Sequence, residues 1–553
     1  MKIIPMLDCL RNYHRADFKG DLSAGAIVAI ILAPQGMAYA MLAGLPPVIG
    51  LYASTIPLFA YALFGSSRHL AVGPVAMISL LVYVGCSRLA ETGTDAYISH
   101  VLLLAFMVGI FQLILGVVRL GFFINFVSHA VISGFTSAAA IIIFLSQLKH
   151  FLGIEISSGH GVIPLLREVA LHLNETNLPT VIIGMVGVGI LLFFRKWRPH
   201  FPAALLVVAI GTLLVYFFHL ENTGVDVVGK VPRGLPALSM PRIDFASLAA
   251  LLPTALTILF VGFMESIAVA EMVASKMKYK VAPNRELVGL GLANLAASFF
   301  SGYPVTGGFS RTAVNYQAGA KTSLASVITA LLILLTLLFL TPLFYYLPKA
   351  VLAGIIAVAV LGLINVKEAV RLFKIKTTDG LILVLSFLLT LGLGIEKGII
   401  AGVFFSLVVF IWRSSHPHTA ELGYLEKEGV FRNIKRFPDA KTFPGIMILR
   451  VDASMYFANM AFIEDCLRHG IEDHTDLKCI IFDLEGVNDI DAVAITNLEE
   501  LISQYQDRGI RFVFASMKGP VRDCVARAGW KEKYGDDIRY LTVKHALVDI
   551  VII

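Results

Sequence analysis

Long apolar segments recur along most of this chain and constrain its fold more than any other feature. The chain has 553 residues, of which 57% are hydrophobic and only 15% are charged, and its mean hydropathy is +0.79. A soluble protein of this length would not have this composition. Because the apolar segments are long enough to cross a bilayer, the sequence predicts a polytopic α-helical membrane protein.

Hydropathy predicts fourteen membrane-spanning segments before about residue 415. They are expected at 22–41, 46–64, 73–88, 98–118, 126–146, 178–195, 203–219, 251–274, 287–301, 309–320, 324–346, 349–364, 379–394 and 398–413. Fourteen segments divide into seven plus seven, which makes the third and tenth equivalent. Both are short and begin beside Gly and Pro, as half-helices do. Short interrupted segments at matching positions point to the binding site of a transporter.

Basic residues support this count. If the amino terminus is inside, cytoplasmic loops follow the even-numbered segments and should be rich in Lys and Arg. The densest groups do follow the eighth and twelfth segments: Lys276, Lys278, Lys280 and Arg285, then Lys367, Arg371, Lys374 and Lys376. We therefore expect a cytoplasmic amino-terminal segment at 1–20, a transmembrane domain at 21–415, and both termini in the cytoplasm.

Two charged residues stand out inside the apolar part of the chain. Glu265 falls within 251–274, and Arg311 follows the Gly/Pro-rich stretch 302–308. A charge at membrane depth costs at least about 2.5–3.5 kcal/mol on insertion scales. An acid and a base beside glycine-broken helices therefore indicate a site for a substrate or a coupling ion. The alternative is that one of them only pairs with a neighbour to hold the bundle together.

The stretch 302–322 carries the strongest chemical signal. A helix starting near Phe309 would direct its free N–H groups and positive dipole end toward an anion, with Ser310 adding a hydroxyl and Arg311 a permanent charge. A second short helix would start from the opposite side at residues 73–76. Two amino ends that face each other would bind an anion without any metal ion. The glycines alone could instead serve close helix packing.

The first segment contains a Pro-Gln-Gly sequence around Gln35. Pro and Gly break a helix, and the Gln35 amide can hydrogen-bond a ligand. A structural kink, with Gln35 bonded to freed backbone groups, explains the same residues equally well.

The carboxy-terminal part, from about residue 420 to 553, is predicted to be a soluble α/β domain. Strands are expected at 446–451, 479–484 and 510–515, with helices at 458–468, 491–507 and 519–528. Strands that alternate with helices imply a mainly parallel sheet. At this length the segment makes one small domain.

Other functions find no support in the sequence. The five cysteines form neither a metal-binding spacing nor a disulfide framework, so no metal or cofactor is expected. The 319–322 stretch has Ala320 where a phosphate-binding loop requires Gly. The net charge of +6 reflects the basic loops, and no nucleic-acid partner is inferred from it. Enzymatic activity is not expected.

Five short segments resemble the sulfate permease (SulP) family of anion transporters, and the carboxy-terminal part resembles its STAS domain. They are 34–40, 44–47, 50–52, 263–266 and 309–312. The resemblance implies a fold of seven-plus-seven inverted repeats with a core and a gate domain, a homodimer, and elevator-like movement of the core. It places the substrate pocket at Gln35, Tyr39, Gly73, Pro74, Val75, Ala76, Glu265, Phe309, Ser310 and Arg311.

The STAS-like part departs from the family at one position. STAS domains that act as phosphorylation switches carry Ser or Thr after the Asp that begins a loop–helix turn. Here Ala492 follows Asp491, so the hydroxyl is missing. We therefore expect no phosphate switch at this turn, although the domain could still bind a cytoplasmic protein.

The sequence thus predicts a secondary anion transporter of an inner or plasma membrane, with sulfate as the expected substrate. Glu265 is the candidate for coupling, either by carrying a proton with the substrate or by helping to hold Na⁺; burial favours the neutral carboxyl and hence the proton. Bicarbonate or a dicarboxylate are alternative substrates. A nucleobase transporter could share this architecture, but a neutral base does not need Arg311. A membrane scaffold or sensor would not explain the charges within the membrane.

Overall fold

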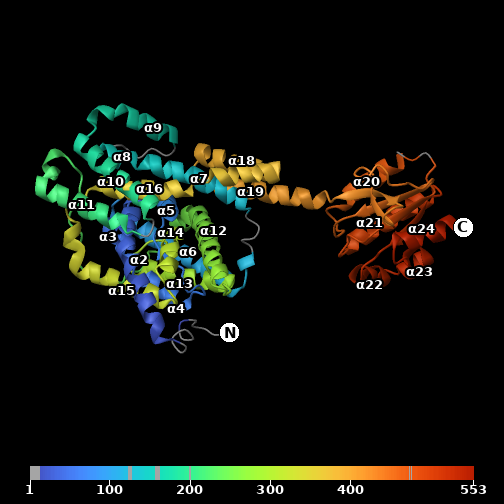
Figure 1. Cartoon of the computed structure of the whole chain (residues 1–553), viewed down its shortest axis with the longest axis horizontal. Helices are drawn as coiled ribbons and strands as arrows, with labels where there is room; N and C mark the ends of the chain where they lie inside the picture. The colour runs from blue at the N-terminus through green and yellow to red at the C-terminus, as the bar shows by residue number, and fades with distance from the viewer. Residues whose placement is uncertain are drawn as a thin grey trace. The chain divides into compact units, whose positions relative to one another are not determined.

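The computed structural model describes residue 6 and residues 13–552, apart from 123–127, 156–161, 199–200, 473 and 475. Much of the predicted amino-terminal segment 1–20 and the first two residues of the predicted span 126–146 therefore lie outside the described residues. The chain divides into two compact units, Met1–Ser406 and Leu407–Ile553 (Figure 1).

The first unit is built almost entirely of helices. Its first half contains α2 (Arg15–Leu42), α3 (Pro47–Tyr52), α4 (Ile56–Phe64), α5 (Ala76–Cys86), α6 (Asp95–Val117), α7 (His129–Ser146), α8 (Leu148–Leu152), α9 (Val162–Leu171), α10 (Leu178–Trp197) and α11 (Ala203–Phe218). Its second half contains α12 (Phe245–Lys276), α13 (Pro283–Phe299), α14 (Phe309–Gln317), α15 (Leu324–Leu335), α16 (Lys349–Val360), α17 (Val366–Ile375), α18 (Thr377–Leu393) and α19 (Ile395–Ser415). The carboxy end of α19 belongs to the second unit.

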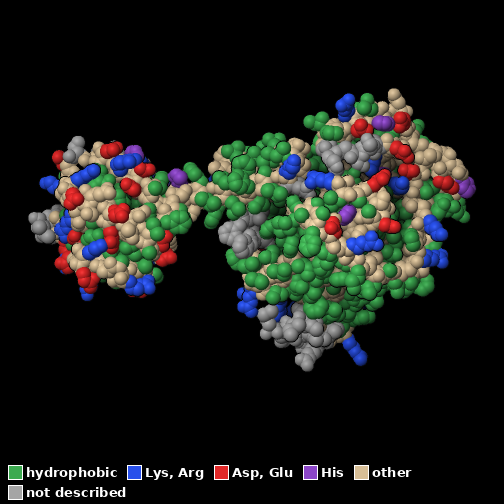
Figure 2. Space-filling view, turned by 180° about the vertical axis from the view of Figure 1, so that it is seen from behind, with side chains coloured by type: hydrophobic (Ala, Val, Ile, Leu, Met, Phe, Trp, Pro, Cys, Tyr) green, Lys and Arg blue, Asp and Glu red, His purple; other side chains and the backbone are tan. Residues whose placement is uncertain are grey.

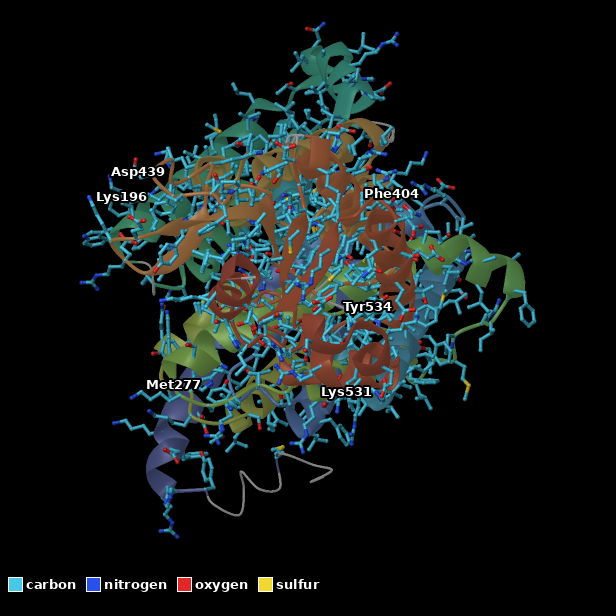
Figure 3. The ribbon with its side chains drawn as sticks, turned by 90° about the vertical axis from the view of Figure 1, so that its right-hand side faces the viewer. Lys196, Met277, Phe404, Asp439, Lys531 and Tyr534 are labelled. Carbon is cyan, nitrogen blue, oxygen red and sulfur yellow. The ribbon has the colours of Figure 1, made fainter. Side chains whose placement is uncertain are left out.

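Nine helical stretches within the described residues are long and apolar enough to cross a membrane, and α5, α11 and α18 are shorter apolar helices. Large apolar side chains lie exposed over much of this unit, as Figure 2 shows; Phe404 of α19, labelled in Figure 3, is one of them. A membrane-embedded surface accounts for this exposure, because lipid solvates apolar side chains. The predicted class of polytopic membrane protein is confirmed, while the total of fourteen spans stays a prediction.

Several predicted spans are broken where the backbone cannot continue a regular helix. The span predicted at 46–64 is two helices, since residues 53–55 leave the helical path before Pro57. The span predicted at 324–346 changes from α15 to a π-helical turn, η4 (Thr336–Leu340), and then to the 3₁₀ turn η5 (Thr341–Phe344), which contains Pro342. Proline removes a backbone donor and clashes with the preceding turn, which explains both breaks.

Two short strands connect the two halves of this unit. Strand β1 (Val72–Gly73) pairs antiparallel with β2 (Thr306–Gly307), with Val72 opposite Gly307 and Gly73 opposite Thr306. Helix α5 begins shortly after β1, and α14 begins shortly after β2. Because the strands run in opposite directions, the two helices leave the pair in opposite directions with their amino ends next to it.

The second unit is an α/β domain around a five-stranded sheet. The strands are β3 (Thr419–Leu425), β4 (Val430–Asn433), β5 (Ile446–Val451), β6 (Cys479–Asp483) and β7 (Arg511–Ala515), in the order β4-β3-β5-β6-β7. The helices are α20 (Met460–Glu472), α21 (Ala492–Gln506), α22 (Gly519–Arg527), α23 (Trp530–Tyr534) and α24 (Val543–Ile552).

The prediction of a mainly parallel sheet is wrong for half of the strand pairings. Strands β5, β6 and β7 are parallel, but β3 is antiparallel to both β4 and β5. The hairpin of β3 and β4 was not predicted, since its strands are only partly buried and lack a continuous apolar run. Its turn is made possible by Gly429, whose φ of +71° suits glycine.

Helix α21 begins at the turn singled out in the sequence. The Asp491 side chain accepts a hydrogen bond of 2.7 Å from the Ala494 backbone N–H and so caps the helix. Ala492 is therefore the first helical residue, and it carries no hydroxyl.

Candidate functional site

The strand pair fixes the amino end of α14. The Gly308 N–H donates to the Ala71 carbonyl at 3.0 Å, and the Ala71 N–H donates to Thr312 Oγ1, also at 3.0 Å. These two bonds bind the first turn of α14 to the residue that precedes β1. Arg311 is the third residue of this helix, and only 3% of it is exposed.

The Arg311 guanidinium lies close to Gly73 of β1 and to Gly308, which follows β2 and caps α14. A Cβ atom on Gly308 would lie 2.8 Å from Arg311 Nη2, and a Cβ atom on Gly73 would lie 3.5 Å from the same nitrogen. Arg311 Nε and Nη2 are buried and have no hydrogen-bond partner among the residues that the structure describes. A buried guanidinium with free donors is costly unless a ligand binds it.

Glu265 extends from α12 and is half-buried. Helix α12 packs against α5, α14 and β2. Glu265 lies close enough to Arg311 for an electrostatic interaction, yet no ion pair joins the two side chains in the described part of the structure. The acid and the base therefore share one region without neutralising each other through direct contact.

Helix α2 brings Gln35 and Tyr39 to the same region. It packs against both α5 and α14, and both side chains are buried. Tyr39 lies within electrostatic range of Arg311 and Glu265. The structure thus brings together residues of the first, third, eighth and tenth predicted spans.

The other predicted residues lie at the two helix starts. Gly73, Pro74 and Ala76 are buried, and Val75 is the half-buried residue just before α5. Phe309 is 52% exposed and Ser310 is also exposed. The first turn of α14 therefore has an accessible side formed by Phe309 and Ser310 and a buried side formed by Arg311.

Sequence reasoning missed the residues that hold β2. Thr306 Oγ1 donates to the Gly262 carbonyl at 2.5 Å and lies 2.7 Å from Ser266 Oγ, which accepts from the Gly307 N–H at 2.8 Å. The Asn294 side chain accepts from the Val305 N–H at 2.7 Å and donates to the Val305 carbonyl at 3.1 Å. The signal available in the sequence was weak: Ser266 and Asn294 are each a polar residue within an apolar helix.

Glu286 of α13 fixes the segment that leads into β1. This fully buried acid accepts hydrogen bonds from the Ser66 N–H at 2.8 Å, the Ser67 N–H at 2.7 Å and the Tyr61 hydroxyl at 2.5 Å. A carboxylate with several donors is well stabilised despite burial. Its position near the predicted start of a span made it look like a loop residue in the sequence.

These features suit a small anion. The amino ends of α5 and α14 lie next to one strand pair, and helix amino ends attract negative charge. Arg311 adds a fixed cation with free donors, while Glu265 supplies a nearby group that can change its charge. Among the described residues, no group of three His, Cys, Asp or Glu side chains could hold a metal ion.

Residues 18–386 match the model of the sulfate permease family, and residues 437–546 match the STAS domain. The chain belongs to the sulfate permease family. It is 40% identical to sulfate transporter 4.1, chloroplastic, of Arabidopsis thaliana, over 99% of this chain and 82% of that protein. The relatives found by sequence carry the names of sulfate transporters.

Two solved structures of transporters share the fold. The murine Slc26a9 anion transporter in its inward-facing state is 26% identical, with a TM-score of 0.92 over 100% of this chain and 94% of that one. The transmembrane domain of the cyanobacterial bicarbonate transporter BicA is also 26% identical, with a TM-score of 0.62 over 71% of this chain and 97% of that one. The predicted combination of a membrane transporter fold with a STAS domain is confirmed.

Proposed function

We propose that this protein is a secondary active transporter of a small anion, and that its substrate is sulfate. The observation that carries the proposal is the buried Arg311 guanidinium, whose Nε and Nη2 donors are free at the amino end of α14. The names of the plant relatives, which are sulfate transporters, support the choice of anion.

The anion would bind where α5 and α14 begin. Arg311 would donate to it from the buried side, while Ser310 and the free backbone N–H groups of the first turn of α14 would donate from the accessible side. Gln35 and Tyr39 of α2 would complete the polar surroundings, beside Gly73, Pro74, Val75 and Ala76. The strand pair would keep these donors in place before the anion arrives.

Glu265 would couple transport to a proton. A divalent anion beside one arginine leaves excess negative charge, and a protonated Glu265 adds none. Release of the proton to the other side would place a carboxylate near Arg311, which then favours departure of the anion. Binding of Na⁺ by an ionised Glu265 is the alternative form of coupling.

The remaining features of the proposal come from the family architecture. A core containing α2, α5, α12 and α14 would move against a gate in an elevator-like step within a homodimer. The STAS domain would regulate the rate or bind a cytoplasmic protein. We place the protein in an inner or plasma membrane with both termini in the cytoplasm.

Bicarbonate remains the second candidate substrate, because a solved relative of the membrane unit is named a bicarbonate transporter. Dicarboxylates would also satisfy Arg311. A nucleobase would leave the guanidinium without a charged partner, and so the geometry disfavours it.

Uptake into proteoliposomes tests the proposal. The purified protein is reconstituted, and uptake of radiolabelled sulfate, bicarbonate, a dicarboxylate and uracil is measured with and without an imposed inward proton gradient. We expect sulfate to accumulate, and to accumulate more with the gradient. If uracil is taken up and none of the anions is, anion transport is refuted. If sulfate uptake responds only to a Na⁺ gradient, proton coupling is refuted.

A further inference from the structure

Helix α17 (Val366–Ile375) connects the apolar helices α16 and α18 and differs from both. The Asn365 side chain caps it by accepting a hydrogen bond of 3.0 Å from the Glu368 N–H. None of its described side chains is buried, although it packs against α7 and α18. It is therefore a surface helix held at one place on the membrane unit.

One side of α17 is apolar and exposed. Val366, Val370 and Phe373 follow one another at helical spacing and are 66%, 50% and 38% exposed. Phe373 is held against α18, since a Cβ atom on Gly380 would lie 2.5 Å from its ring. Water would be an unfavourable neighbour for this row, whereas the boundary between headgroups and acyl chains suits it.

A basic row lies beside the apolar one. Lys367, Arg371 and Lys374 each follow a residue of the apolar row by one position, which places them about 100° around the helix, and all three are exposed. Glu368 is the acid on this helix; it lies 3.5 Å from Arg371 Nη1 and 3.9 Å from His129 Nε2. Lys367 and Lys374 have no ion-pair partner among the described residues, so the row keeps a net positive charge.

The end of a neighbouring span marks the membrane surface at this place. Arg195 of α10 donates to the Val358 carbonyl at 3.2 Å, and its Nη2 lies 3.3 Å from the position that a Cβ atom on Gly362 would take, just ahead of α17. The same helix end carries the exposed Trp197 and Lys196, which is labelled in Figure 3. Tryptophan with Lys and Arg at the end of a span is typical of the membrane–water interface.

We propose that α17 lies in the membrane surface and binds anionic lipid headgroups. The row of Val366, Val370 and Phe373 enters the acyl boundary, while Lys367, Arg371 and Lys374 contact the phosphates. This helix thereby enriches negatively charged lipid beside the joint of α16 and α18. The inference does not depend on which solute the protein carries.

Fluorescence quenching by brominated lipids tests this assignment on the full-length protein. A Val370→Trp variant is reconstituted into nanodiscs in which brominated phosphatidylglycerol or brominated phosphatidylcholine is present at the same mole fraction, and the signal of the unsubstituted protein is subtracted. We expect both lipids to quench the added tryptophan, and the anionic lipid to quench about threefold more effectively. Raising the salt concentration should reduce this ratio.

Variants without the basic side chains test whether their charge, and not only the position of α17 in the membrane, attracts anionic lipid. Adding Lys367→Gln, Arg371→Gln and Lys374→Gln should bring the quenching ratio close to one. Adding Lys230→Gln, Arg233→Gln and Arg242→Gln, which remove three exposed basic residues between α11 and α12, should leave it unchanged. The proposal is overturned if neither lipid quenches the tryptophan. It is also overturned if both lipids quench equally in the Val370→Trp protein that keeps its basic residues.

Discussion

The two short helices that begin at the β1–β2 pair share a backbone arrangement but carry different side chains. Helix α5 starts with Ala76, Met77 and Ile78, all of them buried and apolar. Helix α14 starts with the exposed Phe309 and Ser310 and the buried Arg311. Ile78 and Arg311 occupy the third position of their helices, so an apolar residue in one half corresponds to the cation in the other.

This difference suggests separate roles for the two helices: α5 positions the site, and α14 supplies the groups that contact the anion. Both halves supply a helix amino end, which contributes a partial positive charge whatever its side chains are. Helix α14 adds a full charge and an exposed hydroxyl, whereas Ser79, the hydroxyl in the first turn of α5, is buried and donates to the Val75 carbonyl. The first half can thus be packed tightly for position, whereas the second half must keep polar groups free, at a cost in stability that the strand pair and the Thr306–Ser266 contact help to offset.

Removing the charge from α14 should have the largest effect. We expect Arg311→Ala to weaken anion binding by at least tenfold, since loss of one partner from a desolvated charge contact costs about 2–5 kcal/mol. Titration calorimetry with sulfate on the purified variant measures this loss. Arg68→Ala, which removes an exposed arginine close to β1, is the matched control and should bind normally. Unchanged affinity in a folded Arg311→Ala protein would remove Arg311 from the site.

Replacing the acid should alter coupling more than binding. Glu265→Gln keeps the shape of the side chain but cannot exchange a proton, so we expect uptake that no longer responds to a pH gradient while downhill exchange continues. Proteoliposome uptake at imposed gradients measures this. Glu271→Gln, which changes an exposed acid of the same helix, should stay coupled. Gradient-driven accumulation by the Glu265→Gln protein would exclude this residue as the proton carrier.

Alanine substitutions at the two glycines beside the guanidinium should have different effects. Gly308 has a φ of −92° that alanine tolerates, but a Cβ atom there would lie 2.8 Å from Arg311 Nη2 and displace it. Gly73 has a φ of +155°, which strains any other residue, while its Cβ atom would make an ordinary 3.5 Å contact. We expect Gly308→Ala to lower affinity several-fold with a small change in Tm, and Gly73→Ala to lower Tm more, since backbone strain costs about 1–3 kcal/mol. A larger loss of affinity in Gly73→Ala and a larger loss of Tm in Gly308→Ala would contradict this division of roles between the two halves.

Deleting residues 419–553 should have the smallest effect on binding. The candidate site consists of residues of the membrane unit alone, so we expect sulfate affinity within about twofold of the full chain, with a lower maximal rate or lower expression. Calorimetry and uptake on the same preparation distinguish the two effects. A folded truncated protein that binds no sulfate would mean that the STAS domain shapes the site.

Composition and charge led to the prediction of an anion site, because a charge well inside an apolar span is conspicuous. Glu265 and Arg311 stand out for this reason, and the Gly/Pro breaks indicated where the short helices begin. The strands β5, β6 and β7 were predicted to within one residue or so, since buried parallel strands are continuous apolar runs.

The supporting contacts could not be predicted from one sequence. Ser266 and Glu286 act through partners far away in the chain, and Asn294 binds a backbone group in the loop after its own helix. A polar residue alone does not indicate which backbone group it will bind. The broken helices near Thr55 and Thr336 were missed because hydropathy averages over such breaks. The amphipathic α17 was assigned to a loop, since its charged residues lower the average hydropathy.

The β1–β2 pair also determines when the site can form during synthesis. The Ala71 N–H and carbonyl have their partners on Thr312 and Gly308, which the ribosome adds long after the first half of the membrane unit. Until then these backbone groups lack their partners. Closing so long a loop is slow. The site is therefore a late product of folding, and a chain that stops before residue 306 holds half of it without the strand that completes it.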